Sequence, residues 1–345
     1  MPTKILITDD SSFARKQMTR ALPAEWDVEV LNASDGKEAI EVLLSAAPKV
    51  MFLDLNMPVM DGYETLETII KQDIEVIVIV VSGDIQPLAV QRVTEMGAVE
   101  FIKKPIKNVE LSEVLHRHGI FDLNASVIKQ KSSKSLNKII PSIDNLAANK
   151  FEMQEGYQEV ANVAMGRAAD LLAKLLDSFV VMPIPVVNMI EVSELRMAIQ
   201  QVDDNDTVSG VCQGFIGAGI AGEALLIFNE SSYEDIADLM KYVGDIDEAI
   251  QVELLMDIAN ILISACLKGI AEQLDINFSQ GHPLVIGRHV KVDELLGRSE
   301  SRWSKTMTIE MGFKIEDKNI SSDLLLLFTE DSIKPFDELV SYLID

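Results

Sequence analysis

Acidic and basic side chains stand at the ends of apolar, strand-like runs in the first 120 residues. Asp9 and Asp10 follow the run KILIT, Asp54 closes the run VMFLD, and Lys104 follows EFIK. Three carboxylates that converge on one edge repel each other unless a hard cation lies between them. Oxygen ligands suit Mg²⁺, and a neighbouring lysine can then face a bound anion. These residue types therefore indicate a magnesium site that also binds an anionic group.

The elements that must position these side chains alternate in type. Five apolar runs are each followed by an amphipathic segment, with helices expected around residues 12–21, 37–46, 65–72, 88–96 and 111–116. Strands that are apolar throughout and alternate with helices are typical of a parallel sheet covered on both faces. Ligands of such sheets bind at the carboxyl ends of the strands. The sequence thus predicts a doubly wound α/β domain, (βα)5, whose chemistry lies at one sheet edge.

These residues make the segment 1–121 similar to the receiver domains of two-component response regulators, the CheY-like family. The resemblance implies that Asp54 accepts a phosphoryl group. It also implies that Asp9, Asp10 and Asp54, with the main-chain carbonyl of Asn56, hold Mg²⁺. The implied partner is a histidine kinase, and the chemistry is phosphoryl transfer to a carboxylate, in which positioning and charge neutralisation dominate.

Three further residues gain a role from the same resemblance. Ser82, at the end of the fourth apolar run, is implied to be the switch hydroxyl that contacts the phosphoryl group. Lys104 is implied to pair with a phosphoryl oxygen, and its bond to Pro105 is implied to be cis. Phe101 stands at the position of the switch aromatic, where receivers carry Tyr or Phe.

The composition limits what this protein can bind. The chain has 345 residues, 48% of them apolar, and a net charge of −25. Such an acidic chain is a poor partner for nucleic acid or for an anionic membrane face. Two cysteines are too few for a disulfide scaffold, no signal peptide is recognised, and no apolar run reaches the ~18 residues needed to cross a bilayer. We expect a cytoplasmic protein with neither nucleic-acid binding nor membrane insertion.

Charge and composition divide the chain into three parts. Residues 1–122 form the expected receiver domain, residues 123–150 carry five lysines and lack a clear apolar period, and residues 151–345 hold 13 basic against 34 acidic side chains. The middle part is predicted to be a linker. The negative charge of the last part argues against a DNA-binding output domain.

The last part repeats itself at an offset of about 100 residues. AGEALLIFNESSYEDIADLM at 221–240 aligns without gaps with SSDLLLLFTEDSIKPFDELV at 321–340, and EVANVAMG at 159–166 aligns with DIANILIS at 257–264. Each half is expected to form a long helix, a strand that starts after a proline, a hairpin-like pair of strands and a closing helix. The repeat predicts a pseudo-two-fold α/β domain with two long helices over one sheet.

Each of the two long helices contains an asparagine in its middle, although asparagine is a poor helix former. Asn162 follows Glu159 by three residues, and Asn260 follows Asp257 in the same way. A spacing of three or four places side chains on one helix face. A solvated helix face explains one such pair, and a duplicated scaffold would copy its surface too. That plain explanation stays open for both pairs.

Glu-x-x-Asn followed after 22 residues by proline resembles the signature of the CheC/CheX/FliY chemotaxis phosphatases. Pro185 and Pro283 complete it for Asn162 and Asn260, and the double occurrence resembles CheC. The resemblance implies that the acid pairs with the active-site lysine of a CheY-like phospho-receiver while the asparagine orients a water that attacks the aspartyl phosphate. Asp257 departs from this pattern, since the family has Glu there and Asp is one methylene shorter. The Glu seven residues before each asparagine also departs from the usual Asp or Ser.

Two other interpretations stay open at this point. One makes the last part a non-catalytic adaptor that is gated by phosphorylation and binds another signalling or flagellar-switch protein. The other lets a phosphatase act on its own receiver, in cis or within a homodimer. Neither the cognate kinase nor the direction of regulation is predicted by the sequence.

The run GAGIAG at 217–222 matches Gly-x-Gly-x-x-Gly, a dinucleotide-binding pattern that must open a helix. The residues that follow it, EALLIFNE, are strand-like instead. We therefore expect a tight hairpin there and no dinucleotide site.

Overall fold

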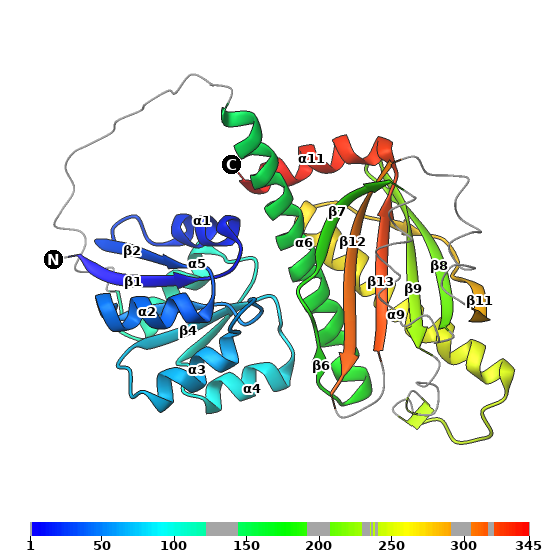
Figure 1. The fold of residues 1–345 in the computed structure, drawn as a ribbon, viewed down its shortest axis with the longest axis horizontal. Coiled ribbons are helices and arrows are strands. Elements are labelled where there is room, and N and C mark those ends of the chain that lie inside the picture. Colours follow the sequence, from blue (N-terminus) through cyan, green and yellow to red (C-terminus); the bar gives the residue numbers. More distant parts are fainter. Residues whose placement is uncertain are drawn as a thin grey trace. The chain divides into compact units, whose positions relative to one another are not determined.

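The computed structural model describes residues 2–121, 144–191, 208–229, 235, 237, 238, 241–290, 305–316 and 321–344. These residues form two compact units. A five-stranded sheet is the centre of one unit, and an eight-stranded sheet is the centre of the other (Figure 1).

The first sheet is parallel throughout, with the strand order β2-β1-β3-β4-β5. Its strands are β1 (Thr3–Thr8), β2 (Val28–Ala33), β3 (Val50–Leu53), β4 (Ile77–Ser82) and β5 (Glu100–Lys103). Each strand is followed by a helix: α1 (Ser12–Ala21), α2 (Gly36–Ala46), α3 (Gly62–Lys71), α4 (Pro87–Glu95) and α5 (Asn108–Arg117). The predicted (βα)5 arrangement is confirmed.

Both faces of this sheet are buried, because successive strand residues point to opposite sides. Leu6 and Met51 pack into an apolar cluster with residues of α2, α3 and α4, whereas Ile7 and Phe52 pack into a second cluster with residues of α1 and α5. Side-chain caps define the helix starts, as at Asp61, which forms a capping box before α3. The helices therefore hold the sheet from both sides and leave its strand ends free for chemistry.

The second sheet is antiparallel, and its unit also contains long helices. It contains β6 (Val180–Val181), β7 (Val186–Glu191), β8 (Val208–Gly217), β9 (Ile220–Asn229), β10 (Ser279–Gln280), β11 (Leu284–Val290), β12 (Lys305–Ile315) and β13 (Ser321–Phe328). The helices are α6 (Asp144–Leu176), α9 (Glu248–Leu274) and α11 (Glu330–Ile344). α6 begins inside the segment 123–150 that was predicted to be a linker. Residues 122–143 lie outside the described residues, so the domain boundaries stay a prediction.

The internal repeat is visible in how the strands pair. The central strands β9 and β13 are antiparallel, and Leu225 lies opposite Leu325, its own equivalent in the repeat. The outer strands are exchanged between the halves: β7 of the first half pairs with β12 of the second, and β11 of the second half pairs with β8 of the first. The two halves therefore build one sheet that neither could complete alone.

The hairpins follow the sequence closely. β8 and β9 are joined by Ala218 and Gly219, which both have positive φ, as a tight two-residue turn requires. The glycine-rich run is thus a hairpin, as predicted. Pro185 and Pro283 stand directly before β7 and β11, at the strand starts where proline is tolerated.

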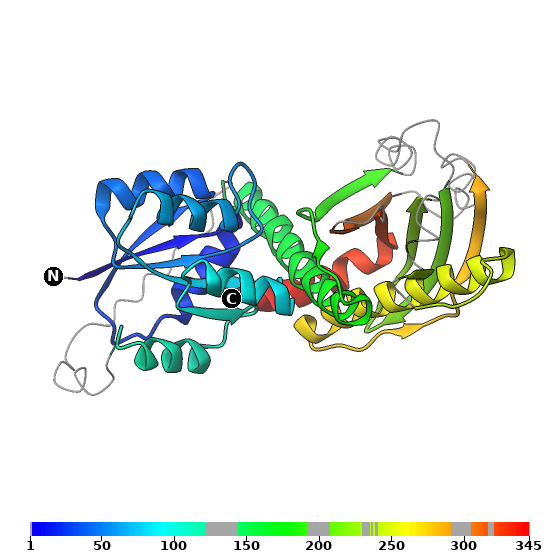
Figure 2. The ribbon, with the colours of Figure 1, turned by 90° about the horizontal axis from the view of Figure 1, so that it is seen from below.

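The two long helices α6 and α9 lie on the same side of the second sheet (Figures 1 and 2). They cross closely at Gly269, where an added Cβ would lie 2.7 Å from the Ala164 Cα, and the Gln273 side chain donates a hydrogen bond of 2.9 Å to the Val160 carbonyl. α9 is long and apolar enough to span a membrane by length and composition alone. However, 67% of its most apolar window is buried inside the structure, as in the core helix of a globular domain.

Candidate functional site

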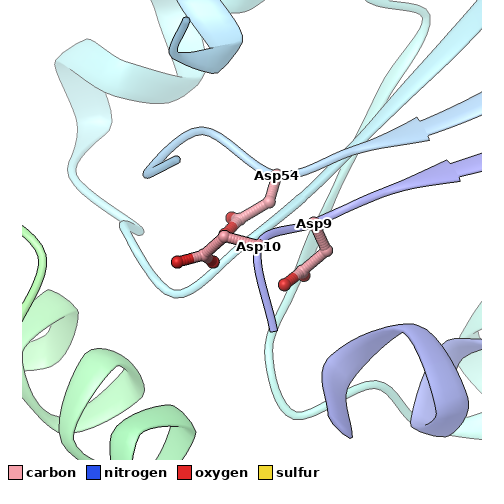
Figure 3. A group of neighbouring side chains, drawn as sticks. All are labelled: Asp9, Asp10 and Asp54. Carbon is pink, nitrogen blue, oxygen red and sulfur yellow. The ribbon is translucent and has the colours of Figure 1, made fainter. Parts of the chain in front are cut away.

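An acidic cluster lies at the carboxyl edge of the first sheet. Asp9 and Asp10 follow β1, and Asp54 follows β3, the strand that pairs with β1. One carboxylate oxygen from each of the three side chains lies within 4.8 Å of the others (Figure 3). The sequence-based prediction that these three residues converge is therefore matched by the geometry.

Lys104 lies in the middle of this cluster. Its Nζ is 2.7 Å from Asp9 Oδ2 and 3.3 Å from Asp54 Oδ2, and the lysine side chain is buried. The Lys104–Pro105 peptide bond is cis, as the resemblance implied. One ammonium group thus lies within 3.3 Å of carboxylate oxygens from two of the three aspartates.

The pKa values of these side chains reflect the close approach of several charged groups. Burial raises the pKa of Asp54 to about 8, with Lys104 opposing the shift and Asp9 adding to it. Burial and the Asp9 charge raise the pKa of Asp10 to about 6. Burial lowers the pKa of Lys104, but Asp54 and Asp9 outweigh it, so its pKa lies well above the ordinary value. Negative charge is therefore in excess at this edge.

The cluster is suited to a hard cation. Hard cations such as Mg²⁺ prefer oxygen ligands and keep several waters, so three carboxylates around one point are an appropriate donor set. Main-chain amides already orient two of them: Ser11 donates to Asp9 Oδ1 at 2.9 Å, and Leu55 donates to Asp54 Oδ1 at 2.8 Å. The residues present therefore fit Mg²⁺. The role of the Asn56 carbonyl stays a prediction.

Arg15 is a residue that the sequence analysis missed. Its guanidinium donates hydrogen bonds to the main-chain carbonyls of Asp9 and Asp10, so it fastens the loop that carries both acids. The signal available in the sequence was its position in the first turns of α1, from which a long side chain can reach back. Sequence spacing alone does not distinguish this from a solvated arginine.

Ser82 and Phe101 occupy two neighbouring strands near the cluster. Ser82 ends β4 and is fully buried, whereas Phe101 lies in β5 and is half-buried against the cluster formed with α2, α3 and α4. In the parallel pairing of these strands Phe101 is opposite Val80, two residues before Ser82. Their assigned switch roles stay predictions.

The two acid–asparagine pairs lie on the two long helices, as predicted. Glu159 and Asn162 belong to α6, and Asp257 and Asn260 belong to α9. Asp257 and Asn260 are exposed. Glu159 and Asn162 are buried, and the buried amide oxygen of Asn162 accepts no hydrogen bond among the described residues. This oxygen is therefore not tied to the sheet that its helix covers.

The model of the response regulator receiver domain matches residues 5–116. The protein-glutamate methylesterase/protein-glutamine glutaminase 3 of Geobacter sulfurreducens is 36% identical over 136 residues, which cover 37% of this chain and 36% of that protein. The receiver domain of Thermotoga maritima CheB is 29% identical, with coverage of 35% and 99% and a TM-score of 0.32. Thermotoga maritima FliY is 18% identical, with coverage of 56% and 97% and a TM-score of 0.42.

Residues 5–116 are thus the receiver domain of a response regulator. Receiver domains are phosphorylated by histidine kinases and bind Mg²⁺ at the phosphorylation site, which agrees with the acidic cluster. The chain matches only about a third of the length of the methylesterase relative. The part of this chain beyond the receiver therefore requires its own functional argument.

Proposed function

We propose that this protein is a response regulator phosphorylated on Asp54, whose C-terminal part hydrolyses the aspartyl phosphate of a CheY-like receiver. The observation that carries the proposal is the duplicated acid-x-x-Asn pair, placed at equivalent positions of two long helices in a pseudo-two-fold unit. The substrate receiver is either a separate protein or the chain's own N-terminal domain.

In the receiver, each residue of the acidic edge has a definite task. The Asp54 carboxylate attacks the phosphorus of a phosphohistidine on the kinase, the phosphorus–nitrogen bond breaks, and the imidazole leaves with the electron pair. Asp9 and Asp10, with the Asn56 carbonyl, would hold Mg²⁺. When bound, Mg²⁺ neutralises charge on the phosphoryl oxygens. Lys104 lies close enough to Asp54 to pair with a phosphoryl oxygen placed there.

The switch residues respond to the new group. The Ser82 hydroxyl contacts the phosphoryl group at the end of β4, and Phe101 changes its packing in response. Both residues lie on strands next to the site, so small shifts there can reach the surface of the domain.

Hydrolysis requires little more than an aligned water. An amide such as that of Asn162 can bind this water in line with the phosphorus without adding negative charge. A bond forms between the water oxygen and phosphorus, and the bond between phosphorus and the aspartyl oxygen breaks. The electron pair leaves with the aspartate carboxylate, and the water proton leaves with the inorganic phosphate.

The acids have a docking task in this scheme. Glu159 aims a carboxylate at the receiver lysine, which gives a charge-assisted hydrogen bond and fixes the register of the asparagine. Asp257 has the same place on α9 with a side chain that is one methylene shorter. We therefore assign the Glu159/Asn162 pair as the stronger site.

The activity named for the curated relative is a different one. Methylesterase and glutaminase activity belong to a protein of which only about a third aligns with this chain, a share close to that of the receiver domain. An assay for release of methanol or ammonia from glutamyl methyl ester or glutaminyl substrates is therefore included as a separate arm. Activity in that arm alone would replace the phosphatase proposal.

The decisive experiment follows phosphate release from phospho-receivers. The chain and a separate CheY-like receiver are phosphorylated with a small phosphodonor, the donor is removed, and phosphate is measured over time. The wild type is expected to shorten the lifetime of the aspartyl phosphate, and the double variant Asn162→Ala, Asn260→Ala is expected to lose this effect. Asn188→Ala, an exposed asparagine on β7, is the matched control. Equal rates for wild type and double variant would refute the catalytic assignment.

The adaptor interpretation is the second candidate, and the shortened acid of the α9 pair favours it for that site. It predicts binding of a phospho-receiver or switch protein with an unchanged phosphate lifetime. Titration of the partner in the same assay separates the two functions, since only a phosphatase lowers the amount of aspartyl phosphate.

A further inference from the structure

The two proposed sites differ one helical turn beyond their asparagines. Gly166 lies four residues after Asn162 on α6, and the equivalent position on α9 is Ser264. Both positions lie on the helix face of the acid–asparagine pair, since spacings of four and seven residues return to the same side. The repeat has therefore kept the asparagines and changed the residue beside them.

A glycine at this place has a cost that needs an explanation. Glycine inside a helix destabilises it by about 1 kcal/mol relative to alanine. Gly269 on α9 is explained by the crossing with α6, where an added Cβ would lie 2.7 Å from the Ala164 Cα. Gly166 lies on the motif face and is buried, and an added Cβ there would lie 2.0 Å from the carbonyl oxygen of Gly83 in the same compact unit. A glycine on such a face allows the backbone of a partner to approach the helix closely.

Ser264, by contrast, is held in place by neighbours. Its hydroxyl donates a hydrogen bond of 2.9 Å to Gln280 Oε1, and Gln213 also donates to this oxygen at 3.4 Å. A second hydrogen bond of Gln213, 2.9 Å to the Gly281 carbonyl, anchors the group further. The face beside Asn260 thus carries a fixed side chain where the face beside Asn162 has only hydrogen.

We propose that Gly166 is the residue that lets the Asn162 site receive a phospho-receiver, and that Ser264 keeps the Asn260 site from doing so. This inference rests on the proposed phosphatase function. A phosphoryl group on a receiver lies at a sheet edge surrounded by loops. When an asparagine reaches that group, the helical turn beside it, about 5.4 Å along the axis, must meet the main chain of those loops. Hydrogen fits there and a side chain does not.

The test uses Gly166→Ala and Gly166→Ser in the full chain. Both remove a helix-destabilising glycine but add a Cβ that would lie 2.0 Å from the Gly83 carbonyl oxygen, so we expect the helix content measured by far-UV circular dichroism to be unchanged while this contact is lost. We expect kcat/KM for phospho-receiver hydrolysis to fall at least about tenfold, mainly through KM, because overpacking weakens docking. Leu171→Ala, an exposed position on another face of α6, is the matched control.

A gain-of-function arm tests the second site independently. In an Asn162→Ala background, Asp257→Glu together with Ser264→Gly is expected to restore part of the hydrolysis rate, and adding Asn260→Ala is expected to abolish it again. Suppose that the wild type is active but the Gly166 variants hydrolyse the phospho-receiver as fast as it does, or that Ser264→Gly restores no hydrolysis. Either result would overturn this inference and leave the phosphatase proposal intact. An inactive wild type would remove both.

Discussion

At the residue scale, the receiver site is a cluster of three aspartate carboxylates, two of which pair with the Lys104 ammonium group. The upward pKa shifts of Asp54 and Asp10 show that the apo cluster favours fewer negative charges than its residues could carry. A phosphoryl group adds further negative charge, so binding of a cation and phosphorylation are favourable together. The site thus carries more negative than positive charge until a cation binds.

Magnesium should therefore stabilise the protein. Asp10→Asn should raise the stability of the metal-free protein and weaken the stabilisation by Mg²⁺. We expect Mg²⁺ at about 100 times its dissociation constant to add ~2.7 kcal/mol to the free energy of unfolding of the receiver. Asp10→Asn should unfold at a higher temperature than wild type in EDTA, because one half-buried like charge is gone, and should gain less from Mg²⁺. Differential scanning calorimetry with and without Mg²⁺ measures both. Asp73→Asn, exposed with a positive φ that asparagine tolerates, is the control.

The sequence predicts this cluster well because its positions follow from topology. Parallel strands bring their carboxyl ends to one edge, so Asp9, Asp54 and Lys104 can be placed together from strand order alone. Arg15 could not be predicted in this way, since its contact with the Asp9 carbonyl depends on the exact exit of the chain into α1. The roles of Ser82 and Phe101 depend on a phosphorylated state and follow from family resemblance only.

At the element scale, the second sheet is built by exchanging outer strands between the two halves of the repeat. The long helices, the strand-starting prolines and the hairpins were predictable from the repeat, because each is a local pattern. The pairing of β7 with β12 and of β11 with β8 was not, since strand partners far apart in sequence leave no local period. The predicted closing helix of the first half lies mostly outside the described residues.

The central strand pair should dominate the stability of this unit. Leu325 is 2% exposed and lies opposite Leu225 on the pseudo-two-fold axis. Leu325→Ala is expected to lower the free energy of unfolding by about 2–5 kcal/mol, as for other buried leucines. Leu284→Ala, on the outer strand β11 and 65% exposed, should change it by less than about 0.5 kcal/mol. Urea unfolding followed by far-UV circular dichroism distinguishes the two.

Asp323 gives this sheet a predictable pH dependence. Burial raises the pKa of the Asp323 carboxyl, and the same effect together with Asp323 raises the pKa of Glu310 on the next strand. A raised folded-state pKa means that stability is present at low pH and is lost as pH rises through that value. Asp323→Asn should therefore gain stability relative to wild type as pH rises from about 4 towards neutrality. A constant difference across this range would contradict the assignment, and Asp275→Asn at an exposed position is the control.

At the scale of the whole molecule, charge sets how two copies meet. Each chain carries a net charge of −25, so copies repel each other at low ionic strength. We expect dephosphorylation between copies to accelerate when salt is raised from about 0.01 to 0.15 M, because the screening length falls from ~30 to ~8 Å.

The experiment mixes two full-length variants. Phosphorylated Asn162→Ala, Asn260→Ala chain serves as the substrate, and Asp54→Asn chain serves as the enzyme. A rate that depends on enzyme concentration and rises with salt is the expected result. Loss of aspartyl phosphate only in the unmixed wild type, independent of dilution, would show action in cis instead.

The exchanged strands also have a consequence for how the two halves are joined. A polypeptide with only one of the two halves would lack the outer strand that pairs with β8 or with β12, so that strand would be an open sheet edge. Two such polypeptides could close these edges by associating. The present unit carries both halves in one polypeptide, which closes these edges within one chain. Within one polypeptide the two halves need not be identical, so Asp257 and Ser264 can differ from Glu159 and Gly166 at equivalent positions.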